Sequence, residues 1–127
     1  MKKIEQVYKI KAPIEKVWQA LVDPKLINEW GGGPAKMSTK EGSEFSLWGG
    51  DIYGTNTKVV ENKLLEQDWF SGHKWQRPSK VSFGLSQKDG VTEIKLVQTD
   101  IPDDEADDID QGWKDYYLGP LKELLEG

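Results

Sequence analysis

The sequence of 127 residues contains no cysteine and a single histidine. The lack of cysteine excludes disulfide bonds, cysteine-ligated zinc or iron–sulfur centres and thiol nucleophiles. The only histidine, His73, has no candidate nucleophile or ligand set beside it, so we interpret it as a loop residue rather than a general base. No serine stands in a Gly-x-Ser-x-Gly elbow. We therefore expect no metal site, no cofactor and no catalytic residue.

Long apolar runs and an excess of basic residues are also missing. No segment approaches the roughly 20 apolar residues that cross a bilayer, and residues 1–20 contain no signal-peptide core. Acidic residues outnumber basic ones by 22 to 17, which gives a formal charge of −5. This balance argues against nucleic acid or an anionic membrane as the main partner. We expect a soluble, cytoplasmic protein with no membrane span.

Acidic residues are densest at 103–110. This cluster lacks the alternating ligand spacing and the central glycine of an EF-hand calcium loop. Carboxylates are favoured in the first turns of a helix, where they face the positive end of its dipole. We therefore interpret the cluster as a helix start and not as a calcium site.

The first thirty residues predict one strand and two short helices. Residues 3–12 alternate as a strand does, with one face made of Ile4, Gln6, Tyr8 and Ile10. Residues 14–22 carry apolar side chains at helical spacing. Asp23-Pro24 should cap and open a second helix, which the glycines at 31–33 end.

The middle of the chain predicts strands only. Six short runs are separated by turn-forming residues such as Asp89-Gly90, and they lie at about 35–39, 43–49, 52–61, 64–71, 79–87 and 91–101. Tight turns between successive strands imply an antiparallel meander. Gly54 and Gly84 inside strands indicate a strongly curved sheet.

A long amphipathic helix should end the domain. Its predicted apolar face consists of Ile109, Trp113, Tyr116, Tyr117, Leu121, Leu124 and Leu125. Pro120 has no backbone N–H, so the helix should bend or break near residues 116–120. Trp18 and Trp113 stand at the centres of apolar stripes, and we expect both to be buried.

The order of elements predicts a single α+β domain over residues 1–127. One strand, two helices, six strands and a long helix follow one another. The sheet has one face to bury, and the final helix is the only element long enough to cover it. We predict one curved antiparallel sheet folded around a long C-terminal helix.

Three segments resemble a known family. They are APIEKVWQALVDPKLINEW at 12–30, GSEFSLWGGDIYGTNTKVVENKLLEQDW at 42–69 and GWKDYYLGPLKELLEG at 112–127. Together they resemble the C-terminal domain of the activator of the heat-shock protein 90 ATPase, and its stand-alone microbial relatives in the START-like (SRPBCC) superfamily. The resemblance implies the helix-grip fold of START-like and Bet v-like proteins. It also implies that part of the space between sheet and helix stays open as a cavity.

The large rings come from elements that should surround this interior, although they could equally fill it as a solid core. Alternation from Ile94 and Leu96 places Gln98 and Asp100 on the same inward face, where they orient a ligand or bond locally near the rim. The predicted cavity residues are Tyr8, Trp30, Phe45, Trp48, Trp69, Phe83, Leu96, Gln98, Asp100, Trp113, Tyr116 and Tyr117.

Three functional hypotheses follow. The first is a non-enzymatic domain that binds a small hydrophobic or amphipathic ligand between sheet and C-terminal helix. The second, implied by the resemblance, is a co-chaperone-like module that modulates a chaperone ATPase in the stress response, through an exposed patch at 71–77 that includes Trp75. The third is an enzyme, because the superfamily includes cyclases and dehydratases, but the sequence offers no clear acid–base pair.

Overall fold

The computed structural model describes residues 1–72 and 75–127, so His73 lies outside the described residues. The chain begins with strand β1 (Lys2–Ile10) and the helices α1 (Ile14–Val22) and α2 (Pro24–Trp30). Strands then follow over the described chain: β2 (Glu44–Leu47), β3 (Ile52–Val60), β4 (Leu64–Ser71), β5 (Ser79–Lys88) and β6 (Val91–Ile101). The C-terminal helix consists of α3 (Ala106–Gly112), a π-helical turn (Trp113–Tyr117) and α4 (Leu118–Glu126).

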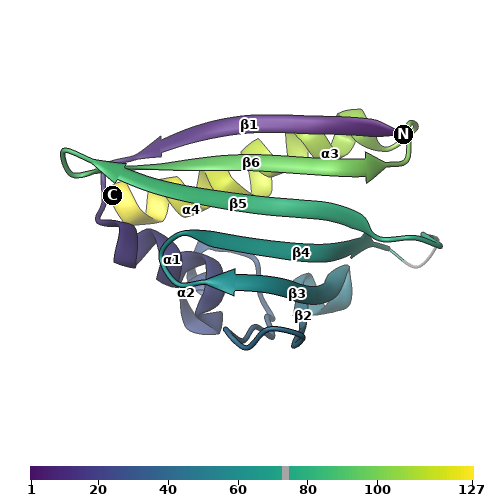
Figure 1. Cartoon of the computed structure of the whole chain (residues 1–127), viewed down its shortest axis with the longest axis horizontal. Coiled ribbons are helices and arrows are strands. Elements are labelled where there is room, and N and C mark those ends of the chain that lie inside the picture. Colours follow the sequence, from purple (N-terminus) through teal and green to yellow (C-terminus); the bar gives the residue numbers. More distant parts are fainter. Residues whose placement is uncertain (73–74) are drawn as a thin grey trace.

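The described strands form one antiparallel sheet in the order β1-β6-β5-β4-β3-β2 (Figure 1). The stretch 35–39, expected as a further strand, joins β2 only through a bridge between Lys36 and Ser46. A turn in which the Ser43 N–H donates to the Lys40 carbonyl at 3.1 Å follows at once and cuts this pairing short. The predicted α+β class and the curved antiparallel sheet are confirmed.

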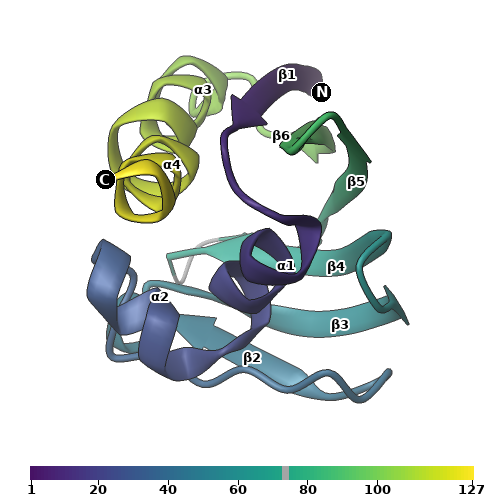
Figure 2. The same ribbon diagram turned by 90° about the vertical axis from the view of Figure 1, so that its left-hand side faces the viewer.

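The sheet curves around the helices. Figure 2 shows the strands turning from β1 at the top to β2 at the bottom, with the C-terminal helix, α1 and α2 inside the curve. The apolar faces of sheet and helices meet in one core, in which Trp18 and Trp113 are 1% and 2% exposed. The predicted burial of both tryptophans is confirmed, and so is the helix-grip arrangement.

The junction of α1 and α2 follows the local sequence. The Asp23 carboxylate accepts a hydrogen bond from the Lys25 N–H at 2.9 Å, and Pro24 occupies the first position of α2, where no backbone donor is needed. Gly31 ends the helix in the left-handed conformation with a φ of 106°. These features turn the chain back toward the sheet and place Trp30 in the core.

The C-terminal helix widens at the π-helical turn instead of breaking. The Leu118 N–H donates to the carbonyl of Trp113, five residues back. Pro120 has no N–H to offer to Tyr116, which is the reason to expect a disruption just here. Close approach also requires glycine at position 119, because a Cβ there would lie 1.9 Å from the Lys114 carbonyl oxygen.

The wide turn changes which side chains face the sheet. More residues per turn bring Leu118 onto the inner face, where it is fully buried beside Tyr117. Tyr116 is 67% exposed, so its predicted place on the buried face of the helix is wrong. A prediction that assumes a regular helix of 3.6 residues per turn cannot reproduce which of these side chains face the sheet.

Strand β6 contains an irregularity near its end. Ile4 pairs with Gln98 and Lys2 with Ile101, so β6 uses one residue more than β1 over this stretch. Asp100 adopts a φ of 61° in this bulge, and the alternation of faces shifts by one residue. Asp100 is therefore exposed while Ile101 is buried. The prediction that Asp100 lies on the inner face is wrong for this reason.

We expect two of the three ring residues of the wide turn, Trp113 and Tyr116, to differ sharply in their effect on stability. Trp113→Ala should lower the free energy of unfolding by about 3–5 kcal/mol, because it removes a buried ring. Tyr116→Ala should cost less than about 1 kcal/mol, because most of its ring faces solvent. Chemical denaturation of both variants measures the difference, and the reverse order would show that the helix sits in another register.

Candidate ligand pocket

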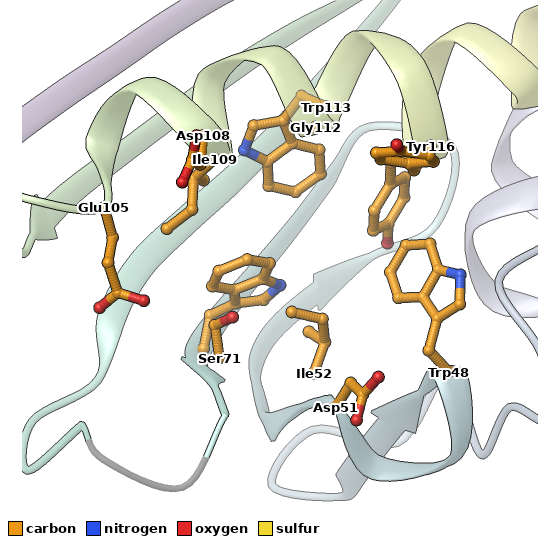
Figure 3. Close-up of a pocket in the computed structure, with 12 residues that line it drawn as sticks. Trp48, Asp51, Ile52, Ser71, Glu105, Asp108, Ile109, Gly112, Trp113 and Tyr116 are labelled. Carbon is orange, nitrogen blue, oxygen red and sulfur yellow. The ribbon is translucent and has the colours of Figure 1, made fainter.

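A pocket of about 380 Å³ lies between the C-terminal helix and strands β3 and β4 (Figure 3). Its helix side is formed by Glu105, Asp108, Ile109, Gly112, Trp113, Tyr116 and Tyr117. Its strand side is formed by Trp48, Asp51, Ile52, Trp69 and Ser71. The lining is mainly apolar, which is typical of sites for small organic molecules.

Packed aromatic rings form the inner wall. Trp113 stacks on Trp69 with ring centroids 5.6 Å apart, and it contacts Tyr117 at 4.6 Å. Tyr117 in turn lies 5.8 Å from Trp48 and 4.7 Å from Trp30. Because each ring is held by at least one other, the wall is rigid on the side that faces the core.

Trp48 reaches the pocket from an unusual backbone conformation. Its φ is 50°, in the left-handed region that residues with a side chain rarely adopt. Two hydrogen bonds hold the segment, from the Trp48 N–H to the Gly32 carbonyl at 2.8 Å and from the Gly49 N–H to the Pro34 carbonyl at 3.0 Å. The loop after α2 therefore positions Trp48 at the pocket.

Gln98 lies behind the aromatic wall. It is fully buried, as the alternation of β6 predicts, and its Oε1 accepts a hydrogen bond from Trp113 Nε1 at 2.7 Å. Gln98 does not line the pocket, so it acts on the site by fixing the ring of Trp113. This contact differs from the ligand-orienting role that we predicted for the amide.

Two donors in the pocket wall have no hydrogen-bond partner among the described residues: Trp69 Nε1 and the Tyr117 hydroxyl. Both side chains are buried, at 4% and 2% exposure. Burial raises the pKa of the Tyr117 hydroxyl well above its usual range, so the group keeps its proton at neutral pH. The wall therefore contains two unpaired donors, and both donor atoms are themselves buried.

Trp75 closes one end of the pocket region. Its indole N–H donates to the Glu105 carboxylate, and its ring packs against Trp69 with centroids 5.9 Å apart. Trp75 is half-buried through these contacts. Of the patch predicted at 71–77, residues 73 and 74 lie outside the described residues, and Trp75 packs inward rather than standing free.

The structure brings five of the twelve predicted cavity residues together at the pocket: Trp48, Trp69, Trp113, Tyr116 and Tyr117. Trp30, Phe45, Phe83, Leu96 and Gln98 are buried in the core outside its lining. The Tyr8 hydroxyl donates to Gln6, whose side chain binds Asp110, so Tyr8 lies away from the pocket. Asp100 lines a neighbouring open groove instead.

Sequence reasoning missed the rim of the pocket, which includes Asp51, Ser71, Glu105 and Asp108. These residues come from a turn, a strand end and a helix start, which only the fold brings together. A signal existed for Glu105 and Asp108 in the acidic cluster, but the helix dipole already explained that cluster. Among the described residues, no group of three or more acidic or histidine side chains is arranged to hold a metal ion.

Residues 11–126 match the family model described as Activator of Hsp90 ATPase homolog 1-like protein. The chain belongs to this family. The matched range includes every residue that lines the pocket. None of the helices in the described ranges is long and apolar enough to cross a membrane.

Two curated relatives of the Hsp90 activator-like chain are much longer than it is. An uncharacterized protein of Schizosaccharomyces pombe is 25% identical over 123 residues, which cover 96% of this chain and 37% of the relative. The activator of 90 kDa heat shock protein ATPase homolog of Dictyostelium discoideum is 32% identical over 90 residues, which cover 68% of this chain and 23% of the relative. The chain thus spans little more than a third of the first relative and less than a quarter of the second.

A solved structure supports the fold over its whole length. The crystal structure of an HSP90 activator from Plasmodium falciparum has a TM-score of 0.89 to this chain at 22% identity, and the match covers 98% of this chain and 96% of the other. At this identity the likeness concerns the helix-grip fold alone.

The contact between Gln98 and Trp113 generates a stability prediction. Gln98→Leu should lower the free energy of unfolding by about 1–3 kcal/mol, because it leaves the buried indole N–H without an acceptor. Combining it with Trp113→Phe removes both partners, so the double variant should lose less than the sum of the single losses. Denaturation of all three variants tests this, and strictly additive losses would contradict the coupling.

Proposed function

We propose that the chain binds a small, mainly apolar molecule in the pocket, and that the inner end of this molecule carries a hydrogen-bond acceptor. The observation that carries the proposal is the pair of unpartnered donors, Trp69 Nε1 and the Tyr117 hydroxyl, in the wall of an aromatic pocket. Most buried polar groups have a partner, and an unpaired one costs about 1–3 kcal/mol. A bound acceptor would remove this cost.

The size and shape of the pocket support a ring-sized ligand. Its volume of about 380 Å³ is at the small end of the range for small-molecule sites, which is roughly 300–1,000 Å³. The rings of Trp69 and Trp113 stack on each other at an interplanar angle of 25°, so a planar molecule would pack on the parts of these rings that line the pocket. Offset stacking on such faces adds to the effect of apolar burial.

Two measurements test the binding function. Native mass spectrometry of the purified protein shows whether a small molecule is retained. Calorimetry with acetylnaphthalene, a planar body with one carbonyl acceptor, is compared with ethylnaphthalene, which has the same shape and no acceptor. We expect acetylnaphthalene to bind more tightly. Absence of both a retained molecule and binding of either compound would rule the proposal out.

We predict that Tyr117→Phe weakens acetylnaphthalene binding while leaving the unliganded protein at least as stable. The substitution removes an unpartnered hydroxyl, so the free energy of unfolding should stay unchanged or rise by about 1 kcal/mol. The affinity should fall up to about tenfold, because one hydrogen bond to the ligand is lost. Thermal denaturation and calorimetry measure the two effects.

Tyr53→Phe is the matched control. It makes the same chemical change on β3, where Tyr53 stacks on Phe70 with centroids 5.2 Å apart and does not line the pocket. Affinity for acetylnaphthalene should be the same in this variant as in the original protein. An equal loss in both variants would indicate a general effect of removing a hydroxyl and would count against the role of Tyr117.

A second candidate function is modulation of a 90 kDa heat-shock protein ATPase. The observation that favours it is the family itself, with a relative from Dictyostelium discoideum and a structural neighbour from Plasmodium falciparum both described as activators. The match to the Dictyostelium relative covers only 23% of its length, so whether this domain alone has the activity needs a direct assay.

We expect the purified chain to raise the ATPase rate of the 90 kDa chaperone from its own organism in a saturable way. The rate is measured at increasing concentrations of the chain, with a chaperone inhibitor as the background control. Tyr117→Phe should keep this effect, because its hydroxyl is buried and cannot reach a protein partner. A constant rate up to a large excess of the chain would end this second candidate.

A further inference from the structure

We infer that the molecule bound in this pocket is an organic cation, with a protonated amine or a quaternary ammonium group at the pocket mouth. The inference rests on the proposed binding function and adds the charge of the ligand to it. Its basis is the rim of the pocket, which carries three carboxylates from two segments, the turn before β3 and the start of α3, together with aromatic rings. Figure 3 shows Asp51 on the strand side, and Glu105 and Asp108 on the helix side.

The rim carries charge of one sign. No lysine or arginine lines the pocket within the described residues. Asp51 and Asp108 are exposed and form no ion pair with any described residue. Glu105 accepts a hydrogen bond from the neutral indole of Trp75, which orients the carboxylate without neutralising it. A positive group at the mouth would therefore meet negative charge on both sides.

Among the described residues, a basic side chain lines the groove next to the pocket. Arg77 lines the neighbouring open groove, which shares Ser71 and Glu105 with the pocket. That groove also contains Asp100 and Asp104, so Arg77 has acidic neighbours of its own. Asp51 and Asp108, which have no ion pair with a described residue, are therefore available to a positively charged ligand.

The rings beneath the carboxylates suit the same ligand. The faces of tryptophan and tyrosine attract cations, and quaternary ammonium groups are bound by such aromatic surfaces in other proteins. Trp48, Trp113 and Tyr116 line the same pocket as the carboxylates, with Trp48 and Tyr116 at the end away from Glu105 and Asp108 (Figure 3). A cation at the mouth would contact ring faces and carboxylates at once, whereas a carboxylate-bearing ligand would be repelled.

The pocket has a second feature that indicates a ligand, besides its acidic rim. This feature is the pair of unpartnered donors, Trp69 Nε1 and the Tyr117 hydroxyl. Trp69 Nε1 is a donor only, so the inner end of the ligand must supply an acceptor, while the mouth favours a positive charge. The inner wall of the pocket thus favours a hydrogen-bond acceptor, and its rim favours a positive charge. The class of ligand that fits is a short amphipathic amine with an apolar body and a neutral oxygen or ring nitrogen at the far end.

Three acetylnaphthalenes test the charge. They carry an aminomethyl, a hydroxymethyl or a carboxymethyl group on the ring away from the acetyl group, and so are positive, neutral and negative at neutral pH. Calorimetry should show the aminomethyl compound binding about tenfold more tightly than the hydroxymethyl compound, with the carboxymethyl compound weakest. The preference should shrink as salt is added, because the rim carboxylates are exposed.

Two variants locate the preference. In the double variant Asp51→Asn/Asp108→Asn, the ratio of the two affinities, aminomethyl over hydroxymethyl, should fall toward one. Asp107→Asn is the matched control, because Asp107 lies in the same first turn of α3 but does not line the pocket. This variant should keep the original ratio.

The outcomes separate this inference from the proposed function. If the neutral compound binds and the cation binds no more tightly, the binding function stands and the charge assignment is wrong. If Asp107→Asn reduces the ratio as much as the double variant does, the attraction comes from the general acidity of the protein and the rim assignment is wrong. If none of the three compounds binds, both the proposed function and this inference fail.

Discussion

The contact of Trp113 with the sheet is the interaction on which the rest of the structure depends. Its indole N–H is tied to Gln98 of β6, and its ring stacks on Trp69 of β4. These contacts fix the position of the C-terminal helix along strands β4 and β6. One side of this assembly is solid core, and the other side is the pocket. The same ring therefore closes the interior and forms the wall of the candidate site.

The pocket wall departs from what stability alone would favour. Trp48 has a left-handed backbone, the helix contains a π-helical turn, and two buried donors in the wall have no partner among the described residues. Strained backbone, π-helical turns and unpaired polar groups tend to occur at functional sites, because selection for stability would otherwise remove them. Here the left-handed Trp48, the π-helical turn and two of the unpaired donors lie at one pocket, whereas the unpaired side-chain atoms of Gln67 and Gln98 lie outside its lining.

The fold could be predicted from the sequence because the spacing of apolar residues along a helix and their alternation along a strand are local properties. Gln98 was placed on the inner face by counting from Ile94 and Leu96, and this held because β6 is regular up to that residue. The same counting failed at Asp100, where a bulge inserts one residue, and at Tyr116, where the helix widens. Pro120 and Gly119 signalled a disturbance but not its form. The rim of Asp51, Glu105 and Asp108 could not be predicted, because only tertiary structure brings these segments together.

The pairing of β1 with β6 has a consequence for the way the domain assembles on the ribosome. Ile4 pairs with Gln98, so about three quarters of the 127 residues must be synthesised before β1 finds its neighbour. At roughly 5–20 residues per second, β1 waits several seconds while β2 to β5 emerge. During this interval Ile4 and Ile10, which are buried in the finished domain, face water. Within this domain, the strand that is made first is therefore the one that waits longest for its neighbour, and docking of β1 is among the last steps of assembly.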